Sequence, residues 1–495
     1  MAFSHSSQAP LCKIPSLTAA LRVSATLSLL SVVMFYQPTL HAESDVIVTT
    51  TASALPVSSL EGPVFSEALR KQLDGFYWQE AASPNTAEGL ALLKQHLHEA
   101  LEQQPRIQSQ RSRERESILQ IDEVRAARRP QVNAGLEYRN DIQRTDSLPD
   151  RGSRVDAVVT LSQLLLDFGA SGERLRAANL TADAAFWQTQ ASIEEEVLYA
   201  IRAYLDVTRI NTQLALAEHN FIQHQRIFDD VQARRDAGAG ARADVLRAKS
   251  RLSDARSRQI SLEGELARAA NVYQEAFFRA PTSLPLTQAS ALLTSMDIEQ
   301  LLDESLARNA SLRSGLLSSQ ASDAEAIAES NARWPRLSVA VEGRQFDVND
   351  FSDADNDVSL LFNVDYTPYS GGATSSRIAQ AEERLLQSEF DQQTLRRELE
   401  REVRSAHTDT TTRLAELKAQ TATLDSEEQA LLAYREQFSI GRSSINDLLD
   451  AQRDLFQAAA ELVNRRTRWE EANFEKLAVT GQLLDAMEIR VEPQE

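Results

Sequence analysis

The stretch GRSSINDLLD, residues 441–450, has an earlier counterpart in GAGARADVLR, residues 238–247. Gly441 and Gly238 lie 203 positions apart, and so do Asp447 and Asp244. Other identical pairs keep this spacing, among them Gly169 with Gly372, Arg174 with Arg377 and Ala255 with Ala458. Because the spacing does not drift, the elements between the matched glycines have equal lengths. The chain therefore consists of two copies of one structural unit.

Each copy contains a long segment without glycine or proline, residues 173–237 in the first and 373–440 in the second. Apolar residues recur in both at spacings of three and four, which predicts helix. About 65 helical residues extend roughly 100 Å, so each helix needs partners along its length, as in a coiled coil or helical barrel. We predict long helices over about 172–237 and 374–439, followed by helices over about 242–278 and 444–485.

Four short segments alternate apolar and polar residues, which is typical of strands. They cover about 131–139 and 154–166 in the first copy, and about 336–346 and 357–367 in the second. Helical stretches at about 88–128 and 297–332 precede them and end near Pro130 and Pro335. An ordinary half-buried hairpin would show the same alternation. Next to helices of this length and a secretory signal, the pattern favours a transmembrane β-barrel, and four strands need more than one copy to close it.

The chain divides into five parts on this interpretation. Residues 1–42 have a basic start, a short apolar core at 23–36 and a small residue before Glu43, as a signal peptide does. An N-terminal extension at 43–86 resembles nothing that we can place. The first repeat covers 87–285, the second 290–486, and a tail covers 487–495. Cys12 is the only cysteine, and it precedes the apolar core, so it is not placed as a lipid-anchoring cysteine.

The composition argues against several classes of function. Lys and Arg number 52 against 72 Asp and Glu, a net charge of −20, which does not suit nucleic-acid binding. The chain shows no phosphate-binding loop, dinucleotide fingerprint or nucleophile elbow. Its few histidines lack the spacing of metal ligands. We therefore expect no enzyme activity, no cofactor and no metal.

The combination of motifs resembles the TolC-type outer-membrane efflux proteins over about residues 87–486. The marks are the signature F-x-x-G-R-x-S-x-x-D-L-L-D-A-Q at 438–452, the glycines between strand and helix, and AVTGQL at 478–483. The resemblance implies a homotrimer whose twelve strands form a pore through the outer membrane and whose twelve helices continue it across the periplasm. It also implies a periplasmic adaptor and an inner-membrane pump as partners, either an ABC exporter or a proton-driven pump.

The same resemblance implies that Asp447 and Asp450 ring the narrow periplasmic end of the tunnel. Spacing i, i+3 places both carboxylates on one helix face, and such rings attract cations. Closely spaced like charges should also raise the pKa of some of these carboxyl groups. Ser444 and Asp447 also have the spacing of a capping box, so Asp447 has a purely structural alternative. Asp450 corresponds to Arg247 in the first copy, which favours Asp450 as the pore-facing residue.

Several small residues and prolines are expected to shape the connections between elements. The helical tips contain Gly238, Asp244, Gly441 and Arg442, and the turns from strand to helix contain Gly169, Pro368, Gly371 and Gly372. An alternative interpretation is a periplasmic coiled-coil adaptor or structural protein, which explains the helices but not the two matched hairpins. The cargo is undecided between protein and small molecules. The missing lipid-anchor motif mildly favours a type I secretion partner.

Overall fold

The computed structural model describes residues 63–77, 84–140, 153–293, 296–346, 348 and 355–492. The expected signal peptide at 1–42, including Cys12, lies outside these residues, as does much of the extension at 43–86. Everything below concerns the described part of the unit from Val57 to Glu495.

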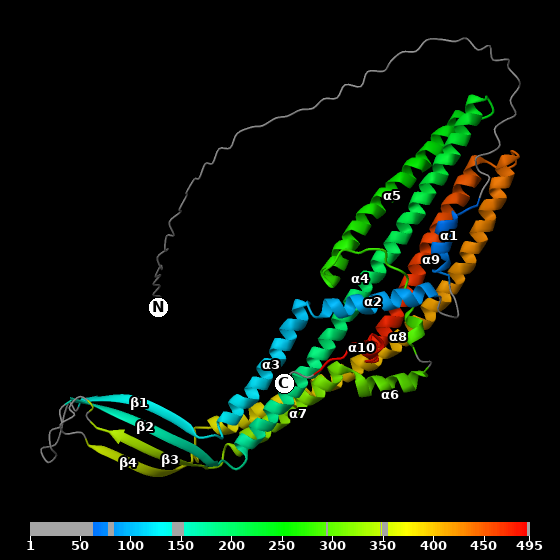
Figure 1. Ribbon diagram of the computed structural model, residues 1–495. Helices are drawn as coiled ribbons and strands as arrows, with labels where there is room; N and C mark the ends of the chain where they lie inside the picture. Colours follow the sequence, from blue (N-terminus) through cyan, green and yellow to red (C-terminus); the bar gives the residue numbers. More distant parts are fainter. Residues whose placement is uncertain are drawn as a thin grey trace, which may run out of the picture. The chain divides into compact units, whose positions relative to one another are not determined.

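The two segments without glycine or proline form two helices of the same length. Helices α4 (Ala170–Asp236) and α8 (Ala373–Ser439) contain 67 residues each. A tight turn joins α4 to α5 (Arg242–Phe277), and another joins α8 to α9 (Ile445–Val479), so that each long helix pairs with the helix that follows it (Figure 1). Helix α4 also packs against α9, which joins the two hairpins. The chain is thus mainly helical and duplicated, as predicted.

Burial along α8 and α9 explains how these helices stay paired. Six of the buried positions of α8 recur every seven residues; they are Val403, Thr410, Leu417, Leu424, Leu431 and Phe438. On α9 buried residues recur at alternating spacings of three and four, starting with Ile445, Leu448, Gln452, Leu455 and Ala459. This is the heptad pattern of a coiled-coil seam.

Shorter helices complete the two copies, and three helical predictions need correction. The remaining helices are α1 (Glu67–Asp74), α2 (Pro84–Leu101), α3 (Pro105–Ala126), η1 (Ala289–Leu292), α6 (Ile298–Arg308), α7 (Ala310–Asn331) and α10 (Leu483–Ala486). The stretch predicted as helix over 88–128 is broken before Pro105, because proline favours the first turn of a helix. The stretch over 297–332 is broken at Asn309, whose side chain accepts a hydrogen bond from the Leu312 amide at 3.0 Å and so begins α7.

The third correction concerns the helix predicted over 444–485, which ends at Val479. Gly481 has a φ of +66°, and a Cβ there would lie 3.0 Å from the backbone of Arg308. The glycine therefore ends α9 and lets α6 approach closely. No helix in the described part of the chain is both long and apolar enough to cross a bilayer.

The four strands form one antiparallel sheet with the order β1-β2-β3-β4. Strands β1 (Gln131–Asn140) and β2 (Ser153–Leu166) come from the first copy, and β3 (Arg336–Gln345) and β4 (Asn356–Asp365) from the second. Pairing of β2 with β3 joins the copies (Figure 1). Within the described sheet, β1 and β4 each pair on one side only, so both outer edges remain open.

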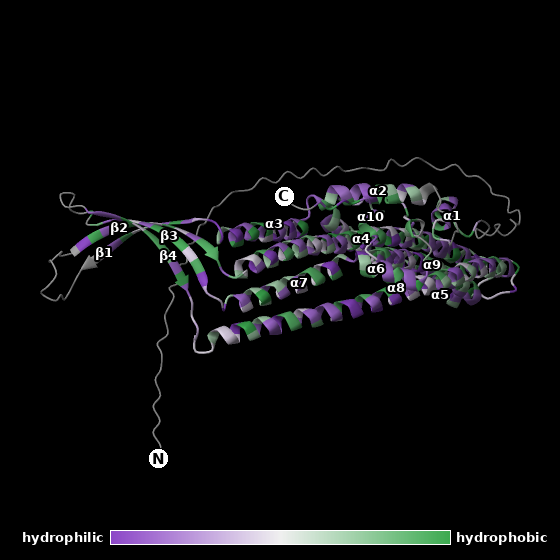
Figure 2. Cartoon of the chain, turned by 90° about the horizontal axis from the view of Figure 1, so that it is seen from below, coloured by the Kyte–Doolittle hydropathy of each residue, from purple (hydrophilic) through white to green (hydrophobic). Residues whose placement is uncertain are grey.

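The strand register separates the apolar and polar residues onto two faces. Leu136 and Val358 lie on the apolar face and are each 76% exposed, and the alternation is visible along the strands in Figure 2. Asp156 lies on the opposite face, is fully buried, and pairs with Arg154 at 3.2 Å. Arg344 lies 3.8 Å from Asp156 and extends this network to two glutamates. A sheet that exposes its aliphatic residues on one face, and gathers an ionic network on the other, fits a bilayer better than water.

Candidate functional site

The two helical tips have the same backbone geometry. In the first, Gly238 (φ +80°) and Ala239 donate their amides to the carbonyls of Arg235 and Arg234, both at 2.9 Å. In the second, Gly441 (φ +73°) donates to Phe438 at 3.1 Å and Arg442 to Gln437 at 2.8 Å. These four bonds match one another at the offset of 203 positions. Both glycines therefore end a helix in the left-handed conformation that favours glycine.

Contacts between the two tips hold them together. Arg234 near the end of α4 stacks on the Phe438 ring of α8, 4.4 Å from its centroid, and donates to the Phe438 carbonyl at 3.4 Å. The same guanidinium forms an ion pair with Asp230, with 2.9 Å between Arg234 Nε and Asp230 Oδ2. Arg247 on α5 donates a hydrogen bond to the Asn446 side chain on α9. Arg247 is the first-copy counterpart of Asp450 in the repeat alignment. It therefore links the two tips.

Asp447 caps the start of α9. Its carboxylate accepts hydrogen bonds from the Ser444 hydroxyl at 2.8 Å, the Ser444 amide at 3.0 Å and the Ser443 hydroxyl at 3.1 Å. The Asp447 amide donates in return to the Ser444 hydroxyl, which completes the capping box. These bonds, that from the Ser444 hydroxyl first, lower the pKa of Asp447 below its usual range. Within one protomer this direction is opposite to the rise expected from like charges.

Asp450 has a different environment, although it lies only one turn further along α9. Its Oδ1 lies 3.1 Å from Arg453 on the same helix and 3.5 Å from Arg251 on α5. Its side chain is about half exposed, at 47%. Asp450 is therefore the acidic residue that connects the second tip to the first, whereas Asp447 serves the fold of its own tip. Asp244, the first-copy counterpart of Asp447, lies in the first turn of α5 without a capping side chain.

The turns at the other end of the long helices are also duplicated. Gly169 (φ +93°) and Gly372 (φ +90°) are the residues just before α4 and α8. Asp167 accepts from the Ser171 amide at 2.7 Å, and the Ser370 hydroxyl, 203 positions later, accepts from the Thr374 amide at 3.1 Å. Sequence reasoning noted the glycines here and missed both capping residues. The signal for them was a short polar side chain three residues before each helix.

The connections that lead into and out of the strands hold the remaining predicted residues. Pro130 directly precedes β1, and Pro335 directly precedes β3. Pro368 and Gly371, which has a φ of +64°, lie between β4 and α8.

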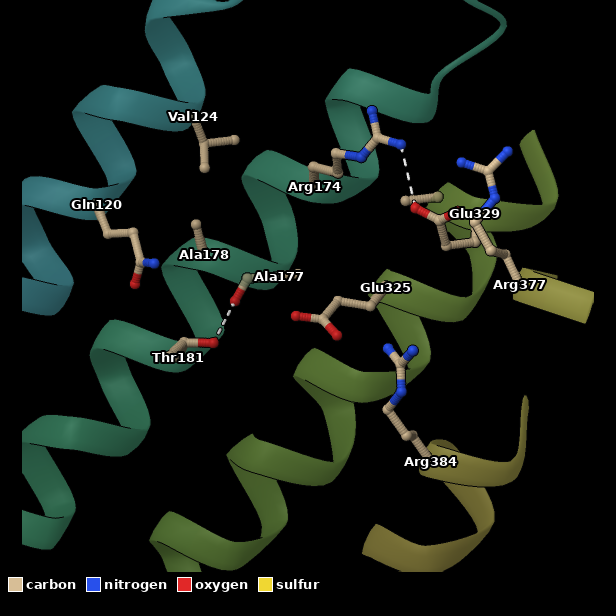
Figure 3. A pocket seen from close by; sticks show the side chains of 11 residues that line it. Gln120, Val124, Arg174, Ala177, Ala178, Thr181, Glu325, Glu329, Arg377 and Arg384 are labelled. Atoms are coloured by element: carbon tan, nitrogen blue, oxygen red, sulfur yellow. Dashed lines mark hydrogen bonds and ion pairs between the residues drawn. The ribbon is translucent and has the colours of Figure 1, made fainter. Parts of the chain in front are cut away.

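A pocket of about 640 Å³ lies where the ends of α3, α4, α7 and α8 nearest the sheet run side by side. Figure 3 shows side chains from all four helices around it, with Arg174 of α4 directed at Glu329 of α7, 3.2 Å away. Arg377 of α8, the repeat counterpart of Arg174, also lines it. Because both outer helices of this row contribute to one pocket, the row is curved and the pocket lies on its concave face. That face is the candidate wall of a tunnel.

Comparison with known protein families identifies the duplicated architecture. The family model for outer membrane efflux proteins matches residues 96–274 and 301–481, once for each copy. The chain belongs to the outer membrane efflux protein family. The family shares the channel architecture that the residue patterns predicted.

Individual relatives agree with this assignment. Outer membrane protein TolC of Vibrio cholerae is 24% identical over 414 residues, which covers 82% of this chain and 91% of the relative. Outer membrane efflux protein BepC of Brucella suis is 25% identical over 329 residues, covering 66% and 72%. The crystal structure of outer membrane protein VceC from Vibrio cholerae has a TM-score of 0.71 at 17% identity, covering 79% of this chain and 96% of that one.

Family membership places this chain in the outer membrane as an export channel. The family and these relatives are channel proteins and not enzymes. This favours the channel over a periplasmic adaptor or structural protein. In the described residues, no group of three or more His, Cys, Asp or Glu side chains is arranged to hold a metal ion.

Proposed function

We propose that three copies of this chain form a trimeric channel-tunnel, the exit duct of a tripartite export system. The observation that carries the proposal is the sheet: both of its edges are open, and its apolar face is bare. Four strands are too few to close a barrel, whereas three copies supply twelve. Edge pairing of β1 with β4 of the next copy would satisfy the remaining backbone groups, as a bilayer requires.

Outer-membrane fractions provide the test of this assembly. The protein should migrate as a trimer in mild detergent and collapse to a monomer of about the chain mass on boiling. Cysteines placed at exposed positions of β1 and β4, such as Val132→Cys with Val364→Cys, should crosslink neighbouring copies into a ladder that ends at three. Recovery of the protein in the soluble periplasm, or a ladder that ends at two, contradicts the proposal.

We infer further that the second tip forms the narrow end of the tunnel, with Asp450 as its principal acidic residue and Asp447 as a contributor. Its pairing with Arg251 supports a role at the contact between tips. In a threefold assembly three Asp450 and three Asp447 carboxylates would surround one opening. Such a ring attracts cations and repels anions. Arg251 and Arg453 offset part of the charge of each Asp450. We therefore propose two roles for Asp450, which are to attract cations and to hold the second tip against the first.

Planar bilayer recordings test the placement of this constriction. Asp450→Asn combined with Asp447→Asn should raise single-channel conductance and weaken block by a trivalent cation. Asp454→Asn is the matched control, because Asp454 pairs with the same Arg453 at 2.9 Å and lies one turn further from the tip. Conductance and block that stay unchanged in the double variant, or change equally in the control, place the constriction elsewhere.

The partners proposed are a periplasmic adaptor and an inner-membrane pump, either an ABC exporter or a proton-driven pump. The support is membership of the outer membrane efflux protein family. Crosslinking in cells followed by purification of the channel should recover one adaptor and one pump. The identity of that pump decides between type I secretion of protein and efflux of small molecules. Purification of the trimer with neither partner contradicts the tripartite assignment.

A further inference from the structure

Helix α1 (Glu67–Asp74) stands outside the duplicated architecture. It precedes the residues that match the family model, which begin at 96. The second copy has only the short 3₁₀ helix η1 in the corresponding place, ahead of α6. Ser66 begins α1 by accepting a hydrogen bond from the Leu69 amide at 3.3 Å. A helix of eight residues is too short to be stable alone, so its packing partners must hold it in place.

The apolar side of α1 is buried against both hairpins. Leu69, Leu73 and Phe76 are at most 5% exposed. They belong to a single apolar cluster that also contains Leu216 of α4 and Leu424 of α8. Figure 1 shows α1 in the region where α4, α8 and α9 run together. The short helix therefore fills a groove whose walls come from both copies of the repeat.

Two polar contacts join this segment to α4. The Gln72 amide group donates to the Thr212 hydroxyl at 3.0 Å. The His219 ring nitrogen lies 2.8 Å from the carbonyl oxygen of Val64, just ahead of α1. Both partners on α4 lie within two turns of each other, so α1 is fixed in register along the helix.

Two further polar contacts join the same segment to α8. Arg70 forms an ion pair with Glu428 at 2.7 Å. The Tyr77 hydroxyl donates to Asp425 at 3.4 Å. Asp425 and Glu428 are one turn apart on α8. The segment thus spans from one long helix to the other.

The contacts of α1 lie far enough from the tips to affect the separation of the tips. Glu428 lies 13 residues before Gly441 and His219 lies 19 residues before Gly238, roughly 20 and 30 Å of helix. α4 packs against α5 and α8 against α9, and α9 contacts both long helices. A small change in their separation beside α1 therefore becomes a larger change at the tips.

We propose that α1 is a strut that fixes the separation of the α4–α5 and α8–α9 hairpins and so restrains movement of the two tips. Docked α1 keeps the tips together through Arg70 and its apolar side. Release of α1 lets the α8–α9 tip swing away from α4. The effect on the constriction rests on the function proposed above, whereas the effect on tip separation does not.

The test uses charge reversal in the full-length chain. In a Cys12→Ser background, spin labels at Ala239→Cys and Ser439→Cys, both exposed, report the distance between the tips. Arg70→Glu or Glu428→Arg alone should lengthen and broaden this distance distribution and speed amide exchange in residues 67–74. The Arg70→Glu/Glu428→Arg double variant should return both towards the wild-type values. Lys71→Glu, an exposed change of the same charge on the same helix, is the matched control.

Deletion of residues 63–77 removes the strut entirely and keeps the test decisive if charge reversal alone leaves α1 docked. An unchanged tip distance after deletion, or after demonstrated release of α1, overturns the proposal. Single-channel conductance is recorded in parallel. If the tips separate without any change in conductance, the proposal that α1 is a strut stands. The proposal that the tips form the constriction is then contradicted. Failure of the two proposals is therefore distinguishable.

Discussion

A single buried carboxyl group illustrates how much the environment of a residue matters in this protein. Glu194 of α4 is 9% exposed and accepts a hydrogen bond from the backbone of Leu483, the first residue of α10. Burial raises the pKa of Glu194 to about 8, against a usual value of 4.5. Between these values the folded protein retains a proton that the unfolded chain has released. The stabilisation from this group is complete below about pH 4.5 and is lost as the pH rises through 8.

Replacing Glu194 with glutamine should therefore flatten the dependence of stability on pH. Glutamine keeps an oxygen that accepts from Leu483 but never ionises. At pH 9 the Glu194→Gln variant should be more stable than wild type by up to about 5 kcal/mol, since the pKa rises from 4.5 to about 8 and one pKa unit corresponds to about 1.4 kcal/mol. Thermal unfolding in detergent at pH 5.5 and 9 measures the effect. Glu195→Gln at the next, exposed position is the control. A variant less stable than wild type at pH 9 contradicts the assignment.

The two aspartates of the second tip show what residue patterns can and cannot predict. The capping box around Asp447 was predictable because it depends on residues three positions apart. The pairing of Asp450 with Arg251 was not predictable in this way, because Arg251 lies on another helix, 199 positions earlier. A pairing at that separation depends on how the hairpins pack, and local spacing carries no information about it.

At the scale of elements, the glycines at the tips can be compared with a glycine inside a helix. A Cβ at Gly238 or Gly441 would meet no atom within 4 Å, so only the positive φ resists a side chain there. Gly172 lies inside α4, also with open space around it and without a positive φ. Gly238→Ala and Gly441→Ala should each cost about 1–2 kcal/mol. Gly172→Ala should gain about 0.5–1 kcal/mol, because alanine loses less entropy in a helix. Unfolding midpoints of the three variants measure these differences, and equal shifts of one sign refute them.

The long helices were predicted well and the short helix α1 was missed, for a physical reason. The periodicity of α4 and α8 extends over 67 residues, so local exceptions do not obscure it. Helix α1 offers only Leu69 and Leu73 within one short helix after Ser66. Its stability comes from α4 and α8, more than a hundred positions away in the chain. Pattern reasoning therefore had no basis on which to place α1.

At the scale of the whole molecule, the two faces of the sheet should respond differently to charge. Phe362 lies on the apolar face and is 66% exposed, whereas Asn363 points to the opposite face. Arginine on a lipid-facing position of a barrel costs about 2–4 kcal/mol at the bilayer midplane. Phe362→Arg should therefore sharply reduce the amount of heat-sensitive trimer in the outer membrane, while Asn363→Arg should not. Equal yields of the two variants would argue against contact of this face with lipid.

The fold class followed from the sequence, because duplication, helix length and strand alternation all report on backbone geometry. The curvature of the α3–α4–α7–α8 row did not follow, since it depends on the packing of side chains between helices. The charged residues of the pocket in Figure 3 were consequently missed, although the match of Arg174 with Arg377 across the repeat was a signal that could have found them.

The open edges of the sheet also have a consequence for biogenesis. A newly exported protomer carries two strands with one unpaired edge each and an uncovered aliphatic surface, which are the features that drive aggregation. Completion of the sheet depends on meeting other protomers, so its rate rises steeply with their concentration. A protomer in transit must then be shielded by a chaperone or be degraded by proteases. Abundance in the outer membrane should accordingly depend on expression level more steeply than in direct proportion.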